Sequence, residues 1–314
     1  MLKVHFLNVG HGDATLIEHP SGNLTLIDIN NSQDPDKETV EEYAQARAAS
    51  QSNALGSTAL LVEARADAVS DLTDPIAYIK QNYPKRSLFR FILTHPDLDH
   101  MRGIKRLHEE IGFTNFWDIA HTKPTPSFQS DADKEDWEYY QALRSGKLGL
   151  TAKNYHRGDR HYAFGCDEAG NGTGDAIQLL SPTSDLVNWC NSTEKSNDLS
   201  YAIRVTHRGT SILLPGDAEQ TAWDGMLKYY GTALGAAVLK AAHHGRDSGF
   251  HLDALKAIKP SVVIVSVGKK PPTDASPKYR THANSVFSTR YYGNIELQVD
   301  DNGTRKWLVQ RNGD

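Results

Sequence analysis

Short apolar runs at the start of the chain alternate with polar turns. Residues 2–9 and 24–29 are mostly apolar, and the run Ala14-Thr15-Leu16-Ile17-Glu18 lies between them. The turn residues Pro20-Ser21-Gly22-Asn23 separate the second run from the third. Short β-type runs joined by such turns predict neighbouring antiparallel strands. We therefore expect the chain to open with an antiparallel sheet.

The pattern changes to helical spacing between residues 37 and 80, where Ala, Glu and Gln recur with a break near Gly56. A further helix is expected from Asp74 to Tyr83, before an apolar strand at 88–93. Strands and helices therefore alternate after the opening sheet.

The segment 124–150 is polar and contains Trp137 and Tyr140, and we interpret it as an inserted helix or flap rather than core. Beyond it the pattern again predicts alternating elements. The expected strands are 176–180, 200–205, 210–214, 237–241, 261–266, 294–299 and 306–310, and the expected helices are about 218–230 and 251–258.

The chain has 314 residues, of which 39% are hydrophobic and 23% charged, which is ordinary globular composition. No repeat or linker separates two parts, so we expect one domain over 1–314 with insertions at about 31–80 and 124–150. The formal net charge of −5 gives no general attraction for nucleic acid. A phosphate-bearing partner would need local positive charge or bound metal.

Localisation and redox chemistry follow from what the pattern lacks. The apolar start is too short for a signal peptide and no run reaches the length of a membrane span, so a cytoplasmic protein with no membrane partner is expected. Cys166 and Cys190 do not form a CxxC pair, and neither a thiolate zinc site nor a disulfide framework is expected.

The segment Thr94-His95-Pro96-Asp97-Leu98-Asp99-His100 directly follows the apolar run at 88–93. It combines two imidazoles with two carboxylates, and this mixture suits divalent ions such as Zn²⁺ or Mn²⁺. The alternative is a polar loop rich in His and Asp, so the remaining chain must decide between the two.

Two later strands also end in candidate ligands. The strand at 210–214 is followed by Pro215-Gly216-Asp217, and the strand at 237–241 is followed by Ala242-His243-His244-Gly245. Polar groups at strand ends can converge on one pocket because the turns there lie outside the core. Taken alone, the aspartate fits an ordinary turn and the histidine pair a capping turn.

Together these motifs resemble those of the metallo-β-lactamase fold hydrolases, and among them the soluble domain of the ComEC-type competence proteins. The matching segments follow the family's order through nearly all of the chain: Phe6-Leu7-Asn8-Val9-Gly10-His11-Gly12-Asp13-Ala14, Leu26-Ile27-Asp28, Leu93 to His100 with Gly103, Leu214-Pro215-Gly216-Asp217, Leu239 to Gly245, and Val263 to Gly268 with His282. The resemblance implies an α/β fold, namely a four-layer α/β/β/α sandwich with helical insertions and a metal site at one edge of two mixed sheets.

The resemblance also implies two divalent metal ions, Zn or Mn, and a role for each motif residue. His95 and Asp97 would bind one ion, Asp99 and His100 the other, and Asp217 would bridge them.

The remaining family-like residues leave alternatives open. His243 is preferred as the additional ligand, with His244 as the alternative. Asp28 would orient the ligand loop, or be a turn acid at a strand end, and Asp13 of the first motif would lie beside the ligands or the substrate.

The chain departs from the common family pattern at three places. Asp97 stands where most members have His, and this favours oxygen-preferring ions and makes manganese a rival to zinc. The usual third-strand histidine has no clear match, so Asn197, Asp198 or water would complete the site. Arg246 and Asp247 precede the serine that usually follows the His-His-Gly motif directly.

Two ions in such a site can activate a water molecule for attack near neutral pH. Asp99 could also accept a proton, and His282, at a family-like position, could protonate the leaving group. Arg246, Lys269 and Lys270 are further cationic groups that could meet a phosphate.

The function expected from these features is a metal-dependent phosphodiesterase, with a nuclease favoured. Two alternatives remain open: hydrolysis of a small phosphodiester or cyclic nucleotide, and a non-catalytic regulatory role that depends on bound metal.

Overall fold

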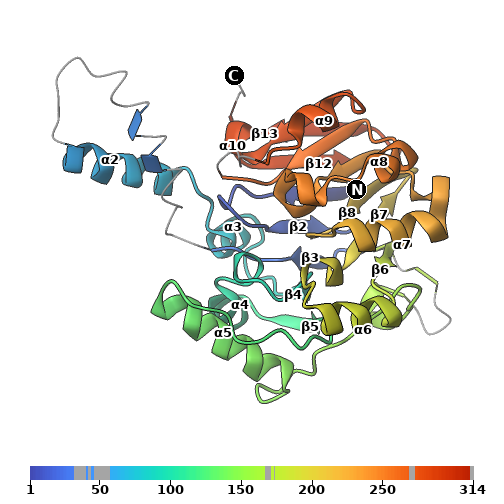
Figure 1. Ribbon diagram of the computed structural model, residues 1–314, viewed down its shortest axis with the longest axis horizontal. Coiled ribbons are helices and arrows are strands. Elements are labelled where there is room, and N and C mark those ends of the chain that lie inside the picture. Colours follow the sequence, from blue (N-terminus) through green and yellow to red (C-terminus); the bar gives the residue numbers. More distant parts are fainter. Residues whose placement is uncertain are drawn as a thin grey trace.

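The computed structural model describes residues 1–31, 40–41, 44–45, 57–166, 171–172, 174–268 and 273–311. Two mixed sheets form its centre (Figure 1). The seven-stranded sheet has the order β13 (Arg305–Val309), β12 (Ile295–Val299), β1 (Leu2–Phe6), β2 (Thr15–Glu18), β3 (Leu24–Ile27), β4 (Leu88–Ile92) and β5 (Phe113–Trp117). The six-stranded sheet has the order β11 (Ser285–Ser288), β10 (Val262–Val265), β9 (Val238–Lys240), β8 (Thr210–Leu214), β7 (Ala202–His207) and β6 (Ile177–Ser181).

Strand direction changes within each sheet. The opening strands β1, β2 and β3 pair antiparallel, which confirms the predicted antiparallel opening. β3, β4 and β5 pair parallel, as do β8, β9, β10 and β11. Parallel strands place their carboxyl ends at one edge of a sheet, and loops that leave these ends can therefore meet.

Helices cover the outer faces of both sheets (Figure 1). The α-helices of the described residues are α2 (Ser57–Ser70), α3 (Pro75–Asn82), α4 (Ile104–Glu110), α5 (Asp131–Arg144), α6 (Ser184–Thr193), α7 (Gln220–Tyr230), α8 (Leu252–Ile258), α9 (Ser276–Arg280) and α10 (Thr289–Tyr292). The helix expected at Asp74 to Tyr83 is α3: the Asp74 carboxylate accepts backbone hydrogen bonds from Ile76 and Ala77, and Pro75 begins the first turn.

Three buried clusters define four layers. Apolar residues of both sheets, such as Phe6 on β1 and Ile212 on β8, pack together between the sheets. The outer face of the seven-stranded sheet packs on α3, α4 and α5, and that of the six-stranded sheet packs on α7 and α8. The predicted α/β/β/α sandwich is confirmed.

The interpretation of residues 124–150 needs a correction. The predicted helix is present as α5, but it is not a flap outside the core. Trp137, Tyr140 and Leu143 recur at helical spacing, are buried, and pack in the cluster that covers the seven-stranded sheet. The polar composition of the segment comes from the opposite face of the helix, which hid this buried stripe.

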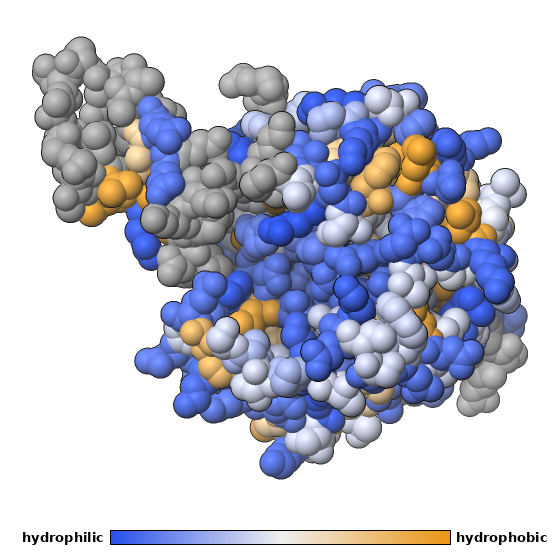
Figure 2. All heavy atoms as spheres, in the orientation of Figure 1, coloured by the Kyte–Doolittle hydropathy of each residue, from blue (hydrophilic) through white to orange (hydrophobic). Residues whose placement is uncertain are grey.

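The first expected insertion lies partly outside the described residues. Its helix α2 extends from the sandwich in Figure 1 and exposes Leu61 and Val62. Elsewhere on the face in Figure 2 the coloured residues are mostly hydrophilic, and hydrophobic ones lie in small separate patches. None of the described helices combines the length and apolar character that a bilayer span requires.

Candidate metal centre

The candidate ligands follow the ends of β4, β8 and β9, and Asp13 joins them from the loop between β1 and β2. The backbone before and at these residues is unusual. Gly216 has φ of +57°, and a Cβ there would lie 2.9 Å from the Ser200 Cβ atom, so this tight turn requires glycine and aims Asp217. His243 and His244 both have positive φ, at 48° and 54°. Two consecutive non-glycine residues in the left-handed region cost conformational free energy. Backbone strain of this kind is concentrated at functional sites.

One carboxylate oxygen lies at the centre of the cluster. The Oδ2 atom of Asp217 is 3.7 Å from His95 Nε2 and 3.4 Å from His100 Nε2, both on the loop after β4. It is also 3.8 Å from His243 Nε2 and 3.4 Å from His244 Nε2, both after β9. Both histidines left open by the sequence therefore reach the same oxygen.

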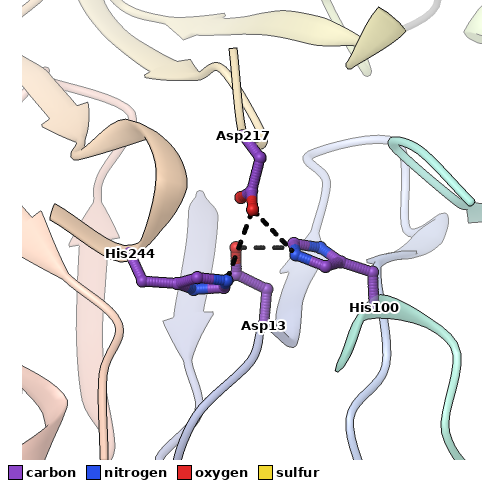
Figure 3. A group of neighbouring side chains, drawn as sticks. All are labelled: Asp13, His100, Asp217 and His244. Carbon is purple, nitrogen blue, oxygen red and sulfur yellow. Dashed lines mark ion pairs between the residues drawn. The ribbon is translucent and has the colours of Figure 1, made fainter. Parts of the chain in front are cut away.

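Four of these side chains form a fully buried group. Asp13, His100, Asp217 and His244 each offer one ligand atom, and these atoms lie within 4.8 Å of one another. In Figure 3 the four side chains point toward one another from separate parts of the chain. Burial and convergence of this kind suit a divalent cation. We call this group the inner half of the site.

The other half of the site is more open. His95 is buried, and its Nε2 atom is 3.7 Å from Asp97 Oδ1, whereas the Asp97 side chain is 28% exposed. The Asp97 carboxylate accepts a hydrogen bond from the Lys123 ammonium group. We call His95, Asp97 and His243 the outer half.

A third set lies at the solvent side of the inner half. Asp99 Oδ2 is 3.3 Å from His244 Nε2 and 3.7 Å from His11 Nε2, and the Asp99 side chain is 24% exposed. His11, Asp99 and His244 could also share an ion. Arg246 Nη2 lies 3.2 Å from His11 Nε2, so a cationic side chain stands beside this set.

Hydrogen bonds behind the ligands fix their orientation. Asp28 is buried, and its carboxylate accepts the Thr94 backbone N–H at 2.7 Å and lies 2.8 Å from His100 Nδ1. His100 thus donates through Nδ1, and its Nε2 atom faces Asp217. Such carboxylate–imidazole pairs set the tautomer of metal-binding histidines.

The other ligands have similar support. Ser200 Oγ accepts the backbone N–H of Asp217 at 3.0 Å. Glu219 Oε1 lies 3.0 Å from His243 Nδ1. The buried Lys240 ammonium group pairs with Asp13.

Mutual charge shifts the pKa values of the cluster. Burial alone would lower the pKa of His244, but the carboxylates of Asp217 and Asp13 raise it to about 10. The pKa of His100 is also well above its usual value, because Asp217 and Asp28 outweigh the effect of burial. Burial would raise the pKa of Asp217, but His244 and His100 hold it well below its usual value. The inner half therefore combines ionised carboxylates with protonated imidazoles, and a divalent ion would displace these protons.

Unpartnered polar atoms show that the site fits a cation. Among the described residues, the Nε2 atoms of His95, His100 and His244 and the Oδ1 atoms of Asp13 and Asp217 are buried without a hydrogen-bond partner. The ion-pair contacts of these atoms, at 3.3 to 3.7 Å, are not hydrogen bonds. Buried polar atoms without partners cost about 1–3 kcal/mol each, and a bound cation would satisfy several of them at once.

Other predicted residues lie outside this group. Asp198 accepts backbone hydrogen bonds from Glu219 and Ala222, so its carboxylate caps α7. Asn197 donates to Glu219 at 3.2 Å, one step behind His243. His282 is exposed just after α9, where its backbone N–H donates to the Tyr279 carbonyl at 3.0 Å, and it belongs to neither group of described residues that could hold an ion. Lys269 and Lys270 lie outside the described residues.

The sequence reasoning missed several neighbours of the site. His11 stood in a quoted motif but received no role, although its place two residues before Asp13 was a usable signal. Lys240 likewise stood in the matched segment from Leu239 to Gly245 and received no role. Lys123 and Glu219 carry no local pattern that marks them, because each meets its partner only through the fold.

Comparisons with known proteins agree with the resemblance. No family model matches the chain. Similar curated proteins include the uncharacterized protein YcaI of Escherichia coli, 25% identical over 119 residues, which are 36% of this chain and 16% of that protein. Competence protein ComA of Neisseria gonorrhoeae is 23% identical over 168 residues, which are 52% of this chain and 23% of that protein. The chain thus spans less than a quarter of either relative, and the predicted similarity to competence proteins is confirmed as a local match.

Similar solved structures include a metallo hydrolase and a metallo-β-lactamase fold protein. Igni18, a metallo hydrolase from the archaeon Ignicoccus hospitalis, is 16% identical, with 98% of both chains covered and a TM-score of 0.48. The metallo-β-lactamase fold protein YhfI of Bacillus subtilis is 13% identical, with 98% of this chain and 100% of that chain covered and a TM-score of 0.48. Identities this low bear on the fold alone, and the fold assignment rests on the layers and strand order described above.

Proposed function

We propose that this protein is a metal-dependent hydrolase that cleaves phosphodiesters at a dinuclear site, with single-stranded or short nucleic acid as its first candidate substrate. The observation that carries the proposal is the Asp217 Oδ2 atom, which lies within 3.8 Å of four imidazole nitrogens from two loops. A carboxylate in this position can be shared between two ions.

The two halves of the site divide the ligands. The inner half, with Asp99 beside it, would hold one ion, and the outer half would hold the other, with Asp217 common to both. When bound, such ions would lower the pKa of a water molecule and stabilise negative charge that develops at phosphorus. Manganese and zinc both suit this mixture of oxygen and nitrogen ligands.

The chain's own side chains supply the remaining steps. Asp99, partly exposed beside the inner half, would accept the proton of the attacking water. Arg246 would bind a non-bridging phosphate oxygen, since its Nε atom is buried and has no hydrogen-bond partner among the described residues. Its placement beside His11 puts this donor at the solvent side of the site.

A second candidate is hydrolysis of a small phosphodiester such as a cyclic dinucleotide. The formal net charge of −5 favours it, because an acidic protein repels long polyanions. The chemistry at phosphorus would be the same for both candidates.

The test is a substrate panel with protein loaded with either Mn²⁺ or Zn²⁺. Linear DNA, RNA, cyclic dinucleotides and bis(p-nitrophenyl) phosphate should include at least one substrate that wild type cleaves and that D217A does not. D217A is also the control for contaminating nucleases, whose activity would persist in it, and D253N, at an exposed aspartate on α8, is the matched substitution that should keep full activity. Inactivity of wild type on all four with both metals would contradict the proposal.

A further inference from the structure

The outer half of the site contains a positively charged side chain, that of Lys123. The Lys123 ammonium group pairs with Asp97, and its Nζ atom also lies 3.4 Å from Ser196 Oγ. The Asp97 oxygen that receives this ion pair, Oδ1, is the one that lies 3.7 Å from His95 Nε2. The ammonium group and an ion held by His95 and Asp97 would therefore compete for one carboxylate oxygen.

Lys123 is held in place by its backbone. Its N–H donates to His121 Nδ1 at 3.0 Å, and the His121 ring bonds Tyr140 of α5 through Nε2 at 2.7 Å. The preceding residue, Thr122, donates its N–H to Asn191 of α6 at 3.0 Å. Contacts with two separate helices fix the segment, and the lysine side chain is only 22% exposed. This differs from a solvated surface lysine, which gains little from an ion pair.

The inner half has no such competitor in its centre. Lys240, its neighbouring cation, pairs with one oxygen of Asp13, Oδ2, and the other oxygen, Oδ1, is buried without a hydrogen bond. The imidazole nitrogens of His100 and His244 that face Asp217 are likewise without hydrogen-bond partners. Asp217, the carboxylate at the centre of the inner half, forms no ion pair with an ammonium group among the described residues, whereas Asp97 of the outer half does.

We propose that Lys123 makes the two halves load in sequence: the first ion binds the inner half tightly, and the second binds the outer half weakly because it must displace the ammonium group from Asp97. This inference rests on the proposed dinuclear site and assigns its loading order. It makes occupancy of the outer half, and so activity, respond to the free concentration of the metal. Two like charges that compete for one oxygen oppose each other strongly in a partly buried position.

The experiment is equilibrium dialysis of the whole chain against increasing Mn²⁺, with bound metal counted by elemental analysis. Wild type should bind one ion tightly and a second at least about tenfold more weakly. K123M should tighten the second step by about tenfold and leave the first within about twofold, because it removes the competing charge and keeps the length of the side chain. K123R, which keeps the charge, should behave as wild type.

K134M removes an exposed lysine of α5 and is the matched control, which should change neither step. Should K123M not fold, K123Q provides the same loss of charge, and the stepwise loading of wild type is tested in any case. Two equal steps in wild type, or an unchanged or weakened second step in folded K123M or K123Q, would overturn the loading order. Binding of no ion at all would instead contradict the proposed function itself.

Discussion

Two buried polar clusters in this protein have opposite characters. In the first, Arg90, which is fully buried on β4, donates to the Ala163 carbonyl, to Thr25 Oγ1 and to the Asp175 carboxylate, and His19 bonds Thr25 Oγ1 and the Asp175 carbonyl. No side-chain atom of these residues is buried without a partner. We call this the closed cluster.

The metal centre also buries aspartate and histidine, but several of its imidazole nitrogens and carboxylate oxygens have no hydrogen bond. Buried polar groups that all form hydrogen bonds with one another stabilise the folded chain. Buried polar groups without such partners are costly until a ligand binds them. The following predictions test this contrast.

The largest effect should come from the aspartate that both halves of the centre share. D217N keeps the shape of the side chain and removes its charge, so activity on the best substrate should fall on the order of a thousandfold, or about 4 kcal/mol in the barrier. Steady-state kinetics at saturating metal would measure this, with D253N for comparison. A D217N variant with more than a tenth of wild-type activity would contradict the central role of this carboxylate.

The equivalent change in the closed cluster should act on stability alone. D175N leaves the buried Arg90 without its charge partner, so the free energy of unfolding should fall by about 3–5 kcal/mol. Urea unfolding in the presence of a chelator would measure this. Metal dialysis of the folded variant should still find the wild-type stoichiometry, and loss of metal binding together with stability would show that the two clusters are not separate.

The sequence predicted these two clusters to very different extents. The ligands could be found because they follow strand ends within short motifs, and an edge of parallel strands brings such ends together. The apolar pattern was enough for individual strands, since runs such as 210–214 define their own boundaries, but the four layers were expected only from the family resemblance. The closed cluster could not be found, because Arg90 and Asp175 lie 85 positions apart and neither stands in a pattern.

The contacts within the site that the sequence could not predict also depend on the tertiary fold. That His244 rather than His243 joins the buried group of four depends on two left-handed backbone conformations, which the two histidine residues themselves do not indicate. The pairing of Lys123 with Asp97 depends on how α5 and α6 hold the intervening segment. The local sequence pattern therefore indicates which residues could bind metal, whereas the contacts of each residue depend on tertiary packing.

The metal centre should release protons when it binds metal. The pKa of His244 is about 10 and that of His100 is well above its usual value, so both are protonated at neutral pH in the metal-free protein. Each proton that the ion displaces should raise metal affinity by about tenfold, or about 1.4 kcal/mol, for each unit rise in pH below these pKa values.

Titration calorimetry from pH 6.5 to 8.5 in buffers of different ionisation enthalpy would measure both the affinity and the number of protons released. D175N should show the same dependence on pH, because its change lies in the closed cluster. A pH-independent affinity over this range would mean that the imidazoles of the inner half are neutral before metal arrives.

The smallest effect concerns the histidine of the closed cluster, where the shift has the opposite sign. Burial, with the neighbouring Arg90 charge, lowers the pKa of His19 to about 3 from 6.5. Between pH 6.5 and 3 the unfolded chain therefore binds a proton at His19 that the folded chain does not bind. The stability that His19 contributes is fully present above pH 6.5 and is lost as the pH falls toward 3. H19Q should reduce the slope of unfolding free energy against pH by up to about 1.4 kcal/mol per pH unit in this window.

Urea unfolding between pH 4.5 and 7 with a chelator would measure the slope, and H282Q, at an exposed position, should leave it unchanged. An identical slope in wild type and H19Q would mean that His19 is protonated in the folded protein. The closed cluster would then hold an unmatched positive charge next to Arg90. The closed cluster lowers the pKa of its histidine, and the metal centre raises the pKa of His244. The sign of the pH dependence therefore distinguishes a buried cluster that stabilises the fold from one that binds a ligand.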